Sequence, residues 1–137
     1  MSAAAVTSPT TSSLRRRALG VGAAVVSCLV IWSIGALAGV DYTVESPGQP
    51  ATDIGVGAIV MVSLGAALLG WATLALLERF APRVALPIWI SLAVVVTLLS
   101  FAPLLNVDAT GGAKLALGAT HVAVAVALIA LLPRPRR

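Results

Sequence analysis

The sequence predicts an all-α integral membrane protein, folded as an up-down-up-down bundle of four helices. Of its 137 residues, 59% are hydrophobic and only 10% are charged, and the mean hydropathy is +1.04. Soluble domains carry about 25% charged residues, and disordered chains combine high charge with low hydrophobicity, so the composition argues against both classes. The few charges leave four long uncharged stretches. Each stretch is close to the roughly 20 residues that an α-helix needs to cross a bilayer.

The first predicted span covers residues 18–40 and follows the basic cluster Arg15–Arg17. Basic residues before an apolar run, with the small residues of Ala36–Ala38 near its end, also resemble a cleavable secretory signal. The apolar region of a signal is about 7–15 residues long, and this run is longer, so we favour an uncleaved helix. Residues 1–17 are then a disordered cytoplasmic tail, because they are rich in Ser, Thr and Ala.

The remaining spans are expected at about 54–77, 86–105 and 113–132. The third begins near residue 86, since Pro87 is tolerated only in the first turn of a helix. The fourth follows the helix-breaking pair Gly111-Gly112. All connections between the spans are short, so consecutive helices are antiparallel neighbours. Residues 18–132 are therefore expected to form a single transmembrane domain.

The arginines predict the orientation of the bundle. Lys114 is the only basic residue on one side of the alternating topology, and the other side holds Arg15, Arg16, Arg17, Arg79, Arg83, Arg134, Arg136 and Arg137. Because cytoplasmic loops carry the excess of Lys and Arg, both termini, including the basic tail 133–137, are expected in the cytoplasm of a bacterium with the spans in its plasma membrane. The net charge of +4 thus reflects membrane topology and lipid headgroups, not nucleic-acid binding.

The chemistry missing from the spans argues against several function classes. None of the spans contains Asp, Glu, Lys or Arg, whereas ion-coupled pumps and transporters usually need such a group within the membrane. Cys28 is the only cysteine, so no intrachain disulfide or Cys-cluster metal site is possible. His121 is the only histidine, so one chain cannot supply a multi-His metal site. We therefore predict a protein that is not an enzyme and has no catalytic residue, metal or cofactor.

A layer of polar residues is predicted near the middle of the membrane. His121 lies about 12 Å into the fourth span at 1.5 Å per residue, and residues of similar depth on the other spans are Ser63, Thr97, Ser27 and Cys28. A histidine facing lipid would leave its ring nitrogens unsatisfied. We expect His121 to face the bundle as a neutral ring, bonded to a hydroxyl of Ser63 or Thr97 or to a backbone carbonyl. It is then either a modest clasp between helices or a ligand- or proton-sensing site.

Two further features suggest contacts with partners. Glu78, Arg79 and Arg83 gather at the cytoplasmic end of the second span, either as a solvated pair worth at most about 1 kcal/mol or as a docking site for another protein. Gly35 and Gly39 form a G-x-x-x-G pattern, which lets helices approach closely within one chain or in a homo-oligomer. Trp71 and Trp89 are expected to anchor the cytoplasmic interface.

Several motifs together resemble a known family. They are the span end Gly39-Val40-Asp41-x-Thr43-Val44, the helix entry Gly55-x-Gly57-Ala58, the stretch Gly70-Trp71-x-x-Leu74-Ala75-Leu76-Leu77-Glu78-Arg79, and a fourth span carrying His121. The chain is similar, from Arg15 to its end, to a family of small four-span actinobacterial membrane proteins known as a domain of unknown function. The resemblance implies a four-helix membrane protein and supplies no activity, ligand or catalytic residue.

These observations lead to two main hypotheses of function. The first is a non-enzymatic membrane protein that acts through contacts with lipid or with another membrane protein, and it follows from the missing chemistry and the short loops. The alternative is a binder or permease for a small neutral or lipophilic solute, held between the helices. A cavity across the midplane lined by Ser63, Thr97 and His121 would favour the alternative, and a tightly packed core would not. A redox or other enzymatic role is a third, weaker hypothesis, which spectra of the purified protein would test.

Overall fold

The computed structural model describes residues 9–133 and confirms the four-helix bundle. The helices are α1 (Pro9–Leu37), α2 (Val56–Phe80), α3 (Ala85–Asn106) and α4 (Gly111–Leu131). Each contains a segment long and apolar enough to cross a membrane. The order of the four expected spans is therefore correct, and their ends shift by a few residues.

The largest shift is at the start of α1. The helix begins at Pro9, so residues 9–17, which we assigned to the disordered tail, are helical and that part of the prediction is wrong. Proline suits the first turn of a helix because its φ angle is already helical. The turns that follow carry Arg16 and Arg17, and both side chains bond to other helices. The rest of the predicted tails, 1–8 and 134–137, lies outside the described residues.

The end of α1 is set by glycine. Gly39 has a φ of +82°, a left-handed conformation that glycine adopts without steric cost. The amide of Val40 donates to the carbonyl of Gly35 at 2.9 Å, and that of Gly39 donates to the carbonyl of Ala36 at 3.1 Å. This pair of bonds is a Schellman motif. The motif ends α1 at Leu37. We expected this helix to end near Val40, so it is three residues shorter at this end.

A short β-hairpin follows α1. Strands β1 (Thr43–Val44) and β2 (Thr52–Asp53) pair antiparallel, with Thr43 opposite Asp53. Backbone bonds between Glu45 and Asp108 join the hairpin to the α3–α4 loop. The two loops at this end of the bundle are thereby tied together. Asp41 accepts bonds from the backbone and hydroxyl of Thr43, and these bonds hold the pKa of the Asp41 carboxyl below its usual value.

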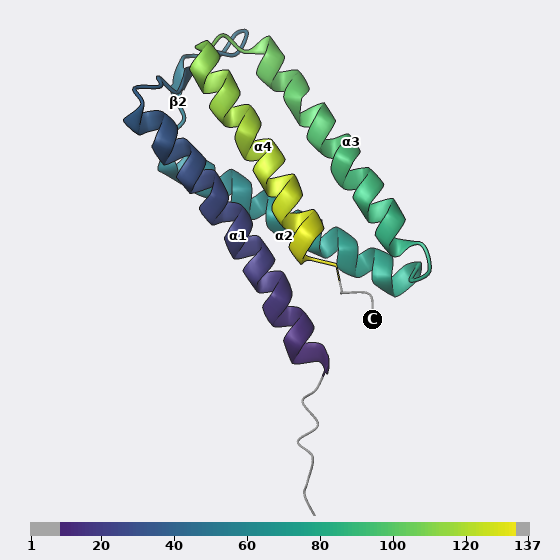
Figure 1. Ribbon diagram of the computed structural model, residues 1–137. Helices are drawn as coiled ribbons and strands as arrows, with labels where there is room; N and C mark the ends of the chain where they lie inside the picture. The colour runs from purple at the N-terminus through teal and green to yellow at the C-terminus, as the bar shows by residue number, and fades with distance from the viewer. Residues whose placement is uncertain (1–8, 134–137) are drawn as a thin grey trace, which may run out of the picture.

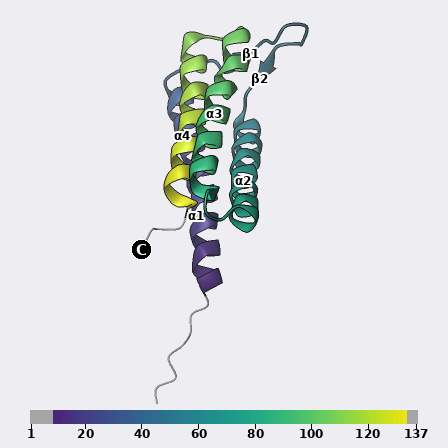
Figure 2. The same cartoon turned by 90° about the vertical axis from the view of Figure 1, so that its right-hand side faces the viewer.

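The four helices are not packed equally. α1 lies along α4 and α2, and α3 lies along α4 (Figure 1). α2 and α3 are joined by a tight turn and diverge away from it, and Figure 2 shows α3 and α4 together with α2 to one side of them. The buried core is concentrated near the turn and consists of Val21, Ala24, Ala67, Leu74, Trp89, Leu128 and Leu132.

Trp89 fastens α3 to α2 at the turn end. Its side chain is 2% exposed, and its indole N–H donates to the carbonyl of Gly70 at 3.0 Å. Our expectation that Trp89 anchors the membrane interface is therefore wrong. The residue is part of the core, which fixes α2 against α3 at one end and leaves them apart at the other.

Candidate functional site

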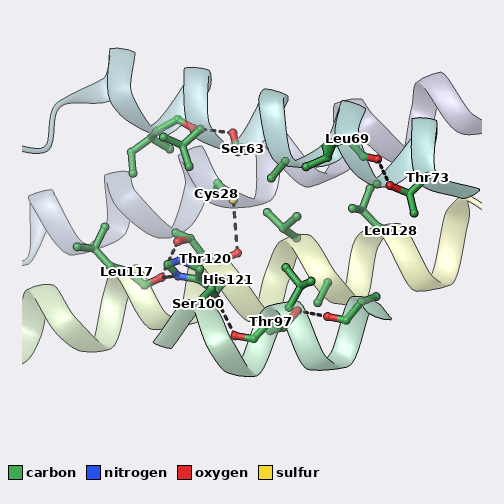
Figure 3. Close-up of a pocket in the computed structure, with 18 of the residues that line it drawn as sticks. Cys28, Ser63, Leu69, Thr73, Thr97, Ser100, Leu117, Thr120, His121 and Leu128 are labelled. Carbon is green, nitrogen blue, oxygen red and sulfur yellow. Dashed lines mark hydrogen bonds between the residues drawn. The ribbon is translucent and has the colours of Figure 1, made fainter. Parts of the chain in front are cut away.

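The divergence of α2 from α3 leaves a cavity of about 510 Å³ between α2, α3 and α4 (Figure 3). This volume lies within the range of roughly 300–1,000 Å³ that is usual for small-molecule sites. Cys28 of α1 lies at its back, and none of the charged residues within 9–133 lines it. The wall is otherwise made mainly of Ala, Val, Leu and Ile side chains.

The cavity brings together most of the polar layer predicted from the sequence. His121, Ser63, Thr97 and Cys28 all line it. Ser27 does not line it, because it lies on another face of α1 and donates to the carbonyl of Ala23 at 2.6 Å. Ser27 and Cys28 have the same depth, but successive residues of a helix point about 100° apart. Depth alone could not decide between them.

Three polar residues of the lining escaped the sequence analysis. They are Thr120, Ser100 and Thr73. Thr120 precedes His121 directly, and Ser100 lies three residues after Thr97, one turn along the same face. The clustering of hydroxyl residues around the predicted layer was the signal that would have found the first two. Thr73 lies ten residues after Ser63, toward the end of α2 and away from the predicted layer, so it gave no comparable signal.

The ring of His121 is oriented by its own helix. Its Nδ1 lies 2.6 Å from the carbonyl oxygen of Leu117, and a carbonyl only accepts hydrogen bonds. Nδ1 therefore carries a proton, and in a neutral ring the lone pair is then on Nε2. The ring also lies 5.8 Å from that of Phe101, between centroids. Of the partners we expected for His121, the structure selects a backbone carbonyl, and this bond does not clasp two helices.

The hydroxyl groups around the cavity also bond within their own helices. Ser63 donates to Ile59 at 2.6 Å, and Thr97 donates to Ala93 at 2.6 Å. Thr120 and Ser100 donate to the carbonyls three residues before them, each at 2.6 Å. Ser and Thr in membrane helices commonly bond the preceding turn in this way. Each hydroxyl hydrogen is thus used, and the oxygen lone pairs remain.

The bond between helices in this layer comes from Cys28. Its thiol lies 3.7 Å from the carbonyl oxygen of Thr120, and the side chain is 1% exposed. The thiol therefore donates a weak hydrogen bond from α1 to α4 behind the cavity. Cys28 is therefore a buried packing residue at the back wall of the cavity.

The cavity opens sideways, between α2 and α3. Val62 and Leu69 of α2 are each 69% exposed, and Val96 of α3 is 61% exposed, yet all three belong to the lining. All three lie within segments that can span the membrane. Exposed apolar side chains at this depth contact lipid tails and not water. The mouth of the cavity therefore faces the hydrocarbon of the bilayer.

At the second predicted site, Glu78, Arg79 and Arg83, the glutamate pairs with a residue of another helix. Glu78 forms a hydrogen-bonded ion pair with Arg17 of α1, 61 positions away, and not with Arg79. Arg79 and Arg83 are exposed and make no ion pair among the described residues. Arg16 donates to the carbonyls of Leu131 and Ala130 at the end of α4, at 2.9 and 3.3 Å. Part of the candidate docking site thus serves to join helices.

The chain matches a known protein family over nearly its whole length. Residues 8–137 match a family described as a family of unknown function, DUF6069. No curated protein and no solved structure matches the chain significantly.

Proposed function

The chain belongs to the DUF6069 family of unknown function, and we propose that this four-span membrane protein binds a small lipophilic molecule in the cavity between α2, α3 and α4. The observation that carries the proposal is the sideways mouth of the cavity. A solute dissolved in the bilayer can enter between α2 and α3 without crossing an aqueous loop. At the middle of the membrane it meets His121, Ser63 and Thr97.

The cavity favours the alternative hypothesis over the contact hypothesis. A protein that acts only through its outer surface has no need to keep a space of about 510 Å³ beside its core. The binding proposal accounts for both the space and the polar layer within it. We infer that the protein is a binder or carrier and not an enzyme, because no group in the lining has the arrangement of a nucleophile with its base.

The cellular setting is part of the proposal. The arginine distribution supports a bacterial plasma membrane with both termini in the cytoplasm. The excess of Arg over Lys supports a GC-rich genome, such as those of actinobacteria. In this orientation the turn between α2 and α3 faces the cytoplasm and the β-hairpin faces outward.

Native mass spectrometry of the protein in lipid nanodiscs tests the binding proposal. We expect the wild-type protein to carry a small lipophilic adduct, or to take one up from added membrane extract. Ala125→Phe fills the cavity, since Ala125 lines it on α4, and should abolish the adduct. Ala119→Phe is the matched control, because Ala119 is exposed on the same helix and does not line the cavity.

Two outcomes would overturn the proposal. One is a wild-type protein that remains without adduct across extracts of different composition. The other is an adduct that survives in Ala125→Phe as fully as in Ala119→Phe, since the molecule would then bind elsewhere. An adduct lost only from the cavity variant supports it.

A further inference from the structure

We infer that the cavity selects a neutral lipophile with a hydrogen-bond donor, such as a free hydroxyl group, over lipophiles that can only accept hydrogen bonds. This inference rests on the proposed function and specifies its ligand. It comes from the direction of the side-chain hydrogen bonds in the lining, several of which are marked in Figure 3.

The donors of the lining are already used by the protein. The hydroxyls of Ser63, Thr73, Thr97, Ser100 and Thr120 each donate to a carbonyl of their own helix. The thiol of Cys28 and the indole N–H of Trp89 donate to carbonyls of neighbouring helices. A ligand carbonyl, ester or ether would gain a donor only if one of these bonds broke first.

The acceptors of the lining remain available. A hydroxyl that donates its one hydrogen keeps oxygen lone pairs. Nε2 of His121 is the strongest of these acceptors, since Nδ1 holds the ring proton against Leu117. No described residue donates to Nε2, and the His121 residue is only partly buried. A ligand hydroxyl can therefore donate to Nε2 without displacing any bond of the protein.

The surroundings of this layer determine the rest of the ligand. The described part of the chain places no charged residue in the lining, so a carboxylate or ammonium group would lose its hydration without gaining a partner. The wall beyond the polar layer is apolar and reaches the lipid through the mouth. The ligand is thus a neutral molecule whose hydroxyl lies near His121 and whose hydrocarbon part extends along α2 and α3.

A pair of matched probes tests this inference in nanodiscs. A dodecanol carrying a photoreactive diazirine labels the protein, and the labelled positions are mapped by mass spectrometry. Unlabelled dodecanol and dodecyl methyl ether then compete with it. Both competitors are lipophilic and both accept hydrogen bonds, but only the alcohol donates one.

We expect the label on cavity residues of α2, α3 and α4, and we expect the alcohol to compete at a concentration about fivefold lower than the ether. This factor is what one net hydrogen bond provides. In His121→Leu the preference for the alcohol should fall, because the strongest acceptor of the lining is lost. Ser27→Ala is the matched control, because Ser27 has similar depth but lies outside the cavity, and it should keep the preference. His121→Phe keeps an aromatic ring without an acceptor, and it replaces His121→Leu if that variant unfolds.

The possible failures are distinguishable. Cavity labelling with equal competition in the wild-type protein would overturn the donor preference while leaving the binding proposal standing. A preference that persists undiminished in both His121 variants would also overturn this inference. Labelling that avoids the cavity altogether would overturn the proposed function itself.

Discussion

Gly35 illustrates how a single residue in this protein is fixed by its neighbours. Tyr42 is 4% exposed, stacks on Trp32 with ring centroids 5.6 Å apart, and donates its hydroxyl to the carbonyl of Trp32 at 3.1 Å. The Tyr42 hydroxyl lies where a Cβ atom at Gly35 would stand. The G-x-x-x-G pattern therefore has a role within the chain: Gly35 makes room for Tyr42, and Gly39 ends α1.

We predict that Gly35→Ala destabilises the protein. The added methyl group must displace the Tyr42 hydroxyl and disturb its bond and stacking, at a cost of about 1–3 kcal/mol. Thermal unfolding in a mild detergent should show a lowered midpoint. Gly22→Ala is the control on the same helix, since a Cβ atom there meets nothing within 4 Å, and it should unfold no earlier than the wild type. Equal midpoints for the two variants would contradict the packing described here.

At the scale of elements, the start of α1 joins the ends of two other helices. Arg16 donates to the last carbonyls of α4, which have no partner within their own helix. A cation at this position also interacts favourably with the helix dipole. Arg17 pairs with Glu78 near the end of α2, and its side chain is 9% exposed. The basic cluster is thus a structural connection as well as a topology signal.

We predict that charge reversal has unequal effects on the two neighbours Glu78 and Arg79. Glu78→Arg places a second cation beside the largely buried Arg17, and it should lower stability by about 1–3 kcal/mol, the worth of a charged hydrogen bond. Arg79→Glu changes an exposed residue with no ion pair among the described residues, and it should unfold like the wild type. Unfolding midpoints in detergent measure both.

The swap Arg17→Glu with Glu78→Arg is the decisive control for this pair. It keeps the net charge and restores opposite charges, so it should regain most of the stability lost in either single variant. A double variant no better than the worse single variant would show that the ion pair contributes nothing to holding α1 against α2.

For the whole molecule, the helices and the charges together predict one arrangement in the membrane. The β-hairpin and the α3–α4 loop lie at one end, tied by the Glu45–Asp108 bonds. The arginines of the described residues lie at the other end, around the start of α1 and the α2–α3 turn (Figure 1). The arginines are thus at the end opposite the β-hairpin and the α3–α4 loop, as the positive-inside rule requires of a four-span protein.

Reporter fusions test this arrangement directly. A fusion after Arg137 should report a cytoplasmic location, and an insertion within residues 46–52 should report an external one. The two sites lie after an even and an odd number of spans, so they must fall on opposite sides of the membrane. Reporters on the same side would refute the four-span topology, and exchanged sides would refute the orientation alone.

The sequence by itself determined where the chain crosses the membrane. An uncharged run of about 20 residues is a local property, and burying a charge in lipid is costly enough to fix the spans without knowledge of the fold. The similar depth of His121, Ser63 and Thr97 follows from counting residues along such spans, and all three line the same cavity.

Only the tertiary structure decided which faces of the helices meet. Helices that are apolar all round have no polar face to define their rotation about their own axes. Cys28 and Ser27 were therefore equivalent in the sequence, although only Cys28 lines the cavity. The partner of Glu78, the burial of Trp89 and the divergence of α2 from α3 depend on contacts between residues far apart in the chain. Trp89 is buried against α2 and holds α3 to it near the turn, and the divergence of the two helices beyond that point leaves the cavity between them.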